Sequence, residues 1–200
     1  MWHGPRLRLK PASVAAIAGC RADAIIHFFG IASDARFLCK SSSMNPLLIE
    51  FSQKLAPVLK ARGFKKTGAT WYRNLDRMIQ VLNIQKSPYA DNFYVNVGIY
   101  LKALGDELRP PEARCHFRFR AESVLGADER FELNRLLDFT QKAPTSDRYQ
   151  DIQILLEKSA LLWLDENSTE QALWKLLQTP DAHAFAVRKG ARDFFSERYD

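Results

Sequence analysis

The sequence predicts an α+β fold: an N-terminal helix, a four-stranded antiparallel sheet, and C-terminal helices packed on the sheet. The first observation behind this prediction is the helical spacing of apolar residues before residue 63. The second is the strict alternation of residue types over 93–101, which is typical of a strand with one buried face. The third is that helical spacing returns after residue 128 and continues toward the end of the chain.

The predicted N-terminal helix begins directly after Met44. Asn45 is a favourable N-cap residue, and Pro46 suits the first helical position. Gly63 is expected to end the helix in a left-handed conformation, and a polar turn over 65–68 then leads into the sheet. The apolar face of this helix is formed by residues at helical spacing: Leu48, Phe51, Leu55, Val58 and Leu59.

Four segments have the composition or the alternation of strands: 69–74, 78–85, 93–101 and 114–120. Pro88 lies just beyond the second, as expected of a residue that cannot donate to a ladder. Short connections between the first three strands imply antiparallel pairing. The third strand places five apolar side chains on one face, so we expect helices to cover at least that face. These five are Phe93, Val95, Val97, Ile99 and Leu101.

The rest of the chain is predicted to be helical. One helix should cover 128–139, after which two sequences resemble the capping box that opens a helix. Proline at a first helical position predicts one more helix. The expected starts are Asp147 with Gln150, Ser168 with Gln171, and Pro180, the last helix ending at Phe194 and Phe195.

Residues 44–200 are expected to form a single α+β domain, preceded by an extension over 1–43. The extension has no sustained periodicity, whereas Met44 stands directly before a capped helix. We therefore predict that translation starts at Met44, or that 1–43 is a poorly ordered extension. A lipoprotein signal that would anchor the protein at Cys20 is an alternative, although its apolar stretch is short. We favour the cytoplasm, since 44–200 contain one cysteine and thus no internal disulfide.

The charge distribution weighs against nucleic acid as a partner. The whole chain has a net charge of +6, but residues 1–43 carry six basic and two acidic side chains. This leaves 23 basic and 21 acidic side chains in 44–200, so the domain itself is nearly balanced. No apolar run approaches the roughly 18–20 residues of a membrane-spanning helix, and we expect no membrane span.

Four short sequences identify a family resemblance. They are GFKK (63–66), WYR (71–73), IQVLNIQKS (79–87) and NFYVNVGIYL (92–101). With the helix that precedes them, they resemble a bacterial family of domains of unknown function, number 4304, over about residues 45–164. Family members typically open with this helix, which agrees with a start at Met44. The resemblance implies no activity, so it brings no catalytic residue to this chain.

The residues themselves indicate no catalytic constellation, metal site or cofactor site. No glycine-rich phosphate loop, nucleophile elbow or paired-cysteine motif occurs. Cys115 and His116 are adjacent, so on a strand they point to opposite faces and cannot bind one metal ion together. An unfamiliar enzyme would have to use His116 and Glu122, which nothing in the sequence positions.

One surface is a candidate binding site. If strands 93–101 and 114–120 share a sheet, one face presents two tyrosines, an asparagine, a histidine and two arginines, which together suit an anionic or planar ligand. Gly98 would let such a ligand approach the backbone, and the second strand would place a lysine at the rim. The alternative is an ordinary solvated or helix-covered sheet face whose arginines pair with acidic residues. The candidate residues are Tyr94, Asn96, Tyr100, His116, Arg118, Arg120 and Lys86.

These observations favour a small bacterial protein that acts as a non-enzymatic binding or protein-interaction module. Its partner would be an unknown protein or a small anionic ligand. The alternatives are an enzyme, or a domain that binds an anionic ligand or nucleic acid on the polar face of the sheet. Sheet-borne aromatic side chains can stack on bases, but nucleic acid ranks lower because the domain is nearly neutral.

Overall fold

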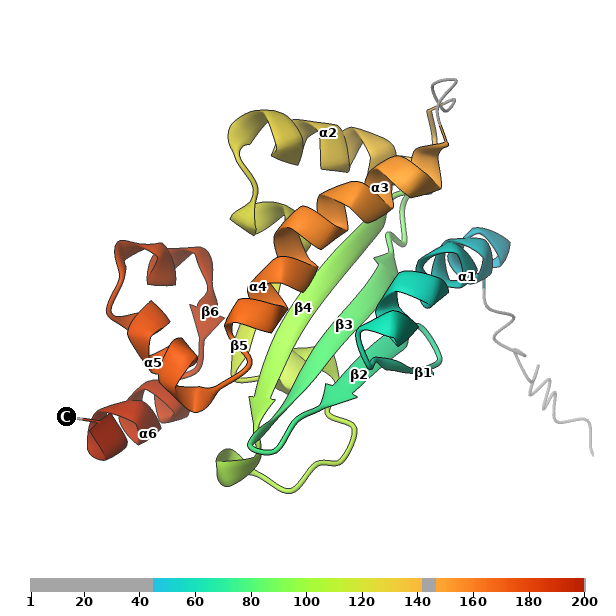
Figure 1. Cartoon of the computed structure of the whole chain (residues 1–200). Coiled ribbons are helices and arrows are strands. Elements are labelled where there is room, and N and C mark those ends of the chain that lie inside the picture. The colour runs from blue at the N-terminus through green and yellow to red at the C-terminus, as the bar shows by residue number, and fades with distance from the viewer. Residues whose placement is uncertain (1–44, 142–146, 200) are drawn as a thin grey trace, which may run out of the picture. The chain divides into compact units, whose positions relative to one another are not determined.

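The computed structural model describes residues 45–141 and 147–199, and the predicted extension over 1–43 lies outside them. The described residues form an α+β domain around one antiparallel sheet of six strands (Figure 1). The strands follow one another in the sheet in chain order, and each pairs with its sequence neighbours. They are β1 (Lys65–Thr67), β2 (Thr70–Asn74), β3 (Met78–Lys86), β4 (Phe93–Leu101), β5 (Phe117–Arg120) and β6 (Ala186–Val187).

The sheet has six strands where the sequence predicted four, because both edge strands are short and lack an apolar alternation. In β1 all three side chains are exposed, and the segment was predicted as a polar turn. Gly68, with φ of +61°, makes the turn that returns the chain to β2. At the other edge, β6 pairs Val187 with Phe117, in a segment predicted to be helical. There Pro180 opens a 3-10 turn that ends at Ala184 instead of an α-helix.

The fourth predicted strand is shorter than expected. Residues 112–114 form a 3-10 turn, and regular pairing begins only at Phe117. His116 still continues the ladder, since its backbone N–H donates to the Ile99 carbonyl at 2.8 Å. The prediction failed at this end because alternation cannot show where a strand leaves its neighbour.

Helices account for much of the remaining described chain, and α3 and α4 run across one face of the sheet (Figure 1). Residues 157–161 form a π-helical turn between α3 and α4, so the two make one interrupted helix. Four 3-10 turns cover 102–104, 112–114, 121–124 and 180–184. The α-helices are α1 (Pro46–Ala61), α2 (Ala127–Leu137), α3 (Arg148–Leu156), α4 (Leu162–Glu166), α5 (Glu170–Leu177) and α6 (Lys189–Tyr199).

Local capping rules account for the helix ends. The Asn45 side-chain oxygen accepts from the Leu47 N–H at 2.9 Å and so caps α1. Gly63 follows the helix with φ of +81°, as predicted for a left-handed end. Asp147 caps α3 as expected, by accepting from the Tyr149 N–H. The cap of α5 is Thr169, one residue later than predicted.

The main core lies between the helices and one face of the sheet. All five apolar residues predicted to share a face of β4 are buried there, beside Leu82 and Ile84 of β3. Phe51 and Leu55 of α1 belong to the same cluster, as do Leu156 and Leu164 of the interrupted helix. The predicted helical cover over the apolar face of β4 is thus confirmed.

The opposite face of the sheet carries a second, small core. It consists of Ile79, Val81, Tyr100 and Cys115, with Tyr72 packed against them. The residues after β4 form this cover, because their 3-10 turn over 112–114 contacts both β3 and β4. This face is therefore closed at the C-terminal end of β4 and open toward its N-terminal end, where Tyr94 is only half-buried.

Candidate functional site

Strand register places most of the predicted site residues on one face of the sheet. Asn96 pairs with Arg120 and Gly98 with Arg118, and residues opposite each other in antiparallel strands share a face. Tyr94 and Tyr100 lie on the same face, since they alternate with the five residues of β4 that belong to the main core. The small core divides this face into a closed part and an open part.

Tyr100 and His116 occupy the closed part. Their rings pack against each other at a tilt of 44°, with centroids 4.8 Å apart, and both residues are buried. His116 Nδ1 accepts from the Leu101 N–H at 3.0 Å. Burial, together with the positive charge of Arg188, lowers the pKa of His116 from its usual value. The imidazole is thus held neutral in an internal position, where a ligand on the sheet cannot contact it directly.

Arg118 lies at the border between the two parts. Its Nε donates to Glu112 Oε1 at 2.8 Å and its Nη2 to Glu112 Oε2 at 3.3 Å. The hydrogen bond to Glu112 raises the pKa of the Arg118 guanidinium. A paired guanidinium can bind an anion only by exchanging Glu112 for it, so this arginine is the weaker candidate of the two.

Tyr94 and Arg120 form the exposed centre of the open part. The Arg120 guanidinium carbon lies 4.2 Å from the centre of the Tyr94 ring, in the geometry of a cation–π contact. The Arg120 side chain remains 53% exposed, and its salt bridge to Glu122 is long, at 3.9 Å. Asn96 lies beside this pair, and its Nδ2 donates to Gln85 Oε1 at 2.9 Å.

Two neighbouring polar residues extend this surface and were not predicted. Asn83 pairs with Asn96 across the strands, and its Nδ2 donates to Thr70 Oγ1 at 2.8 Å. Gln85 pairs with Tyr94 and is exposed. The signal for both was their alternation with the apolar residues of β3, but their place beside Tyr94 follows only from the register. We name Asn83, Gln85, Tyr94, Asn96 and Arg120 the open sheet face.

Lys86 does not belong to the open sheet face, which corrects the prediction. It pairs with Phe93, so register directs it to the opposite, helix-covered side. Its ammonium group forms a salt bridge with Asp91 at 3.0 Å and donates to the Ala90 carbonyl at 3.3 Å. A lysine at the end of a strand was assigned to the rim because the sequence could not show which face the register gives it.

Gly98 also has a different role from the predicted one. A Cβ atom at this position would lie 2.6 Å from the Cys115 sulfur. The space above the glycine is therefore filled by the protein's own side chain and not left for a ligand. Burial raises the pKa of the Cys115 thiol to about 12, so this group is an inert part of the small core.

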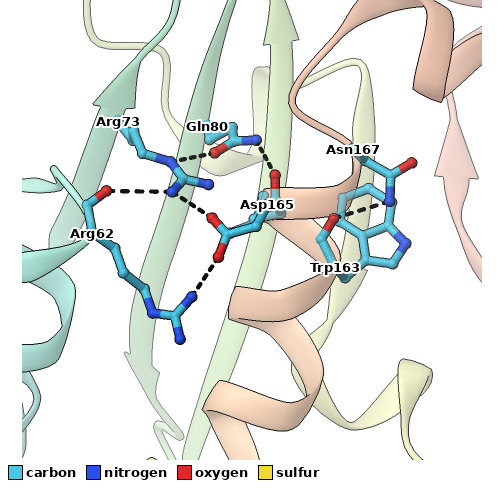
Figure 2. A network of polar contacts seen from close by, with 7 residues as sticks. Arg62, Arg73, Gln80, Trp163, Asp165 and Asn167 are labelled. Carbon is cyan, nitrogen blue, oxygen red and sulfur yellow. Dashed lines mark hydrogen bonds and ion pairs between the residues drawn. The ribbon is translucent and has the colours of Figure 1, made fainter.

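A polar network on the helix-covered side was missed by the sequence analysis (Figure 2). Arg73 donates from Nε to Gln80 Oε1 at 2.7 Å and from Nη1 to Asp165 Oδ1 at 2.6 Å. Arg62 forms a second salt bridge, to Asp165 Oδ2. The fully buried Gln80 donates from Nε2 to the Leu164 carbonyl at 2.6 Å. Since Asp165 lies far from both arginines in sequence, no local pattern could have predicted this group.

The polar network joins four elements of the fold. Arg62 ends α1, Arg73 lies on β2, Gln80 on β3 and Asp165 on α4. Both the oxygen and the nitrogen of the buried Gln80 amide have a hydrogen-bond partner, as a buried amide requires. The polar network therefore attaches the interrupted helix to the sheet, and its charged side chains are paired with one another.

The described residues contain no group of three or more His, Cys, Asp or Glu side chains that could hold a metal ion. Within the same ranges, no helix combines the length and the hydropathy needed to cross a membrane. His116 and Glu122, the pair that an unfamiliar enzyme would have to use, are not brought into a shared hydrogen bond in this part of the chain.

Comparison with curated proteins and with solved structures gives no match. A family model does match, with the description "Domain of unknown function (DUF4304)", over residues 55–166. The match includes α1 from Leu55 onward, β1 to β5, and the interrupted helix through the end of α4. It covers more than half of the chain and agrees with the resemblance found in the strand sequences. The chain therefore belongs to the DUF4304 family.

Proposed function

We propose that this protein is a non-enzymatic binding module that recognises another protein through the open sheet face. The observation that carries the proposal is the exposed stack of Arg120 on Tyr94, at 4.2 Å. Tyrosine and arginine are the residue types that, with tryptophan, most often dominate the binding energy of protein interfaces. The sheet supports both from a rigid backbone, so little conformational entropy is lost when they bind.

The charges around Arg120 indicate the chemistry of the partner. Its only salt bridge to a described residue is the 3.9 Å contact with Glu122, which leaves the guanidinium free to donate to a closer carboxylate. Beside it, Gln85 is exposed and presents its amide to a partner, whereas the amides of Asn83 and the buried Asn96 donate within the face, to Thr70 and Gln85. We infer a partner whose surface carries a carboxylate within an otherwise polar patch.

A small anionic ligand or nucleic acid is a weaker candidate for the same face. The two arginines of β5 are matched by Glu112 and Glu122, so the local charge is close to balanced. Nucleic-acid affinity depends on uncompensated positive charge, which this face lacks. Single-stranded oligonucleotide should accordingly show no salt-dependent binding in fluorescence anisotropy.

We infer that this module is bacterial, as the family resemblance suggested, and that it works in the cytoplasm, as the cysteine content suggested. The support is that the one cysteine of 44–200, Cys115, is a free buried thiol, which fits a reducing compartment. The proposal of a protein partner does not depend on this location.

Site-specific photocrosslinking in cells tests the proposal. A photoreactive residue at Gln85, beside Tyr94, should give a discrete adduct with one recurrent partner. The matched control is the same residue at Tyr89, which is 95% exposed but lies in the loop between β3 and β4. The adduct should disappear in the Y94A/R120A variant and persist in R77A, which removes an exposed arginine elsewhere.

Two outcomes would overturn the proposal. One is an adduct at position 85 that Y94A/R120A leaves unchanged while circular dichroism shows the variant folded. The other is the same set of adducts from positions 85 and 89, which would indicate random collisions in place of a specific surface.

A further inference from the structure

A cavity of about 510 Å³ lies between the end of α4, the 3-10 turn over 121–124 and the 3-10 turn over 180–184. Its volume is within the range of small-molecule sites, about 300–1,000 Å³. Residues 163–166 come from the family-matched segment, whereas 181–185 come from the chain beyond it. The cavity is thus completed by a segment that the family match does not include.

Aromatic rings form the apolar part of the cavity wall. Trp163 and Phe185 both line it, with ring centroids 5.1 Å apart. Phe119 supports them from the sheet, 4.5 Å from Trp163 and 5.1 Å from Phe185. Each of the three residues is buried, so the wall is a packed cluster and is held in place before any ligand arrives.

The charged side chains that the described residues contribute to the wall are acidic. Glu166 and Asp181 line the cavity, and no Lys, Arg or His of the described ranges does. Neither carboxylate forms a salt bridge with a residue in the described ranges. Both side chains are exposed, so they keep their charge at the cavity rim.

Asn167 supplies an acceptor inside the cavity. The residue is only 8% exposed and lines the cavity, yet one of its two polar atoms is unused. Its Nδ2 donates to the Trp163 carbonyl at 2.9 Å, and its Oδ1 points away from that bond (Figure 2). No described residue donates to this oxygen. The oxygen itself is not sealed from solvent, so it is available to accept from an N–H or O–H group of a ligand in the cavity.

We propose that this cavity binds a small organic cation, in which an ammonium group is attached to an aromatic or aliphatic body. The apolar body would pack on Trp163 and Phe185, where the indole also attracts the positive charge. The ammonium group would donate to Asn167 Oδ1 and face the carboxylates of Glu166 and Asp181. This site lies apart from the open sheet face, since the two share no residue. It is independent of the proposed protein partner.

Three probe compounds of similar shape separate the contributions of charge and of the apolar body. They are tryptamine, its neutral analogue indole-3-ethanol, and the anionic indole-3-propionate. Binding to the full-length protein at neutral pH and low salt is measured by ligand-observed NMR titration. Tryptamine should bind about tenfold more tightly than the neutral analogue, and the anion should bind most weakly.

Removing the two rim carboxylates tests the residues. The E166Q/D181N variant should weaken tryptamine binding about fivefold and leave indole-3-ethanol unchanged. The matched control is D193N/E197Q, which neutralises two exposed carboxylates on α6 and should change neither. All four side chains are exposed, so we expect both variants to fold like the natural sequence. A thermal melt of each variant checks that the fold is retained.

Several results would overturn the proposal. Equal binding of tryptamine and indole-3-ethanol would show that the cavity does not select charge. Equal weakening by the rim variant and the α6 variant would show that only long-range charge matters. No binding of any probe up to about 10 mM would remove the cavity as a site for small organic cations.

Discussion

The Cys115 sulfur occupies the space directly above Gly98, on the face of the sheet opposite the helices. An added Cβ at residue 98 would meet this sulfur at 2.6 Å and the Cys115 Cβ at 2.7 Å. Both distances are far below van der Waals contact, so the glycine and the cysteine fit only as a pair. The contact also anchors the segment after β4 over the small core.

The first prediction is that Gly98→Ala destabilises the protein by about 1–3 kcal/mol, because the new methyl group forces Cys115 or the strand to shift. The free energy of unfolding is measured by urea denaturation. Gly190→Ala is the matched control, since a Cβ there meets no atom within 4 Å and alanine favours the α6 helix. A G98A variant as stable as the natural sequence would show that the small core is loosely packed.

The second prediction concerns the polar network around Asp165. Arg73→Ala should lower the free energy of unfolding by about 2–3 kcal/mol. The substitution leaves the carbonyl oxygen of the buried Gln80 amide without its donor, and it removes one of the two arginines that pair with Asp165. Arg62→Ala should cost only about 0.5–1 kcal/mol, since this side chain is 31% exposed against 13% for Arg73. Urea denaturation of both variants measures the difference.

The exposed pair of Arg77 and Asp76, at 3.3 Å, supplies the control for these arginine variants. Arg77→Ala should change the free energy of unfolding by less than about 0.5 kcal/mol, as is usual for surface ion pairs. Equal losses of stability in R62A and R73A would show that the polar network stabilises the fold through the charge of Asp165 and not through the hydrogen bond to the buried Gln80 amide.

The sequence predicted well those elements that local physics determines. Asn45 and Gly63 mark the ends of α1 because capping depends only on the residue and its nearest backbone groups. The nine residues of β4 were predicted with the correct bounds, since strict alternation over that length has no helical alternative. By contrast, β6 has two residues, and its existence follows from pairing with Phe117 across a long stretch of chain.

The candidate site was predicted in part, for a similar reason. Alternation placed Tyr94, Asn96 and Arg120 on one face, and register agrees with this. It could not show that Tyr100 is covered from the other side, because the covering segment has no regular pattern. Nor could it show the contact of Arg73 with Asp165, which depends on how α4 packs against the sheet.

The third prediction is that the Cys115 thiol resists alkylation in the native protein. With a pKa of about 12, only roughly one thiol in 10,000 is a thiolate at pH 8, and burial blocks access as well. Iodoacetamide followed by mass spectrometry of the peptide that contains Cys115 measures the rate. Labelling should rise only across the urea unfolding transition, and rapid labelling in native buffer would contradict the buried position.

The fourth prediction is that His116 makes the protein less stable at mildly acidic pH. Burial and the charge of Arg188 lower the folded-state pKa below 6.5, so the unfolded state binds more protons in the interval between the two values. The stability contributed by the neutral imidazole is complete above pH 6.5 and decreases as the pH falls toward the folded-state pKa. The free energy of unfolding should therefore be lower at pH 5.5 than at pH 7.5.

Replacing the histidine isolates its share of this pH dependence. His116→Asn keeps an acceptor for the Leu101 N–H but cannot titrate, so the difference between the two pH values should shrink. His183→Asn, at an exposed position, is the matched control and should leave the difference unchanged. Arg188→Gln should raise the pKa of His116 toward its usual value in an NMR titration. The substitution removes the positive charge of Arg188, which is the second cause, after burial, of the lowered pKa. An equal pH dependence in H116N and the natural sequence would assign the effect to other groups.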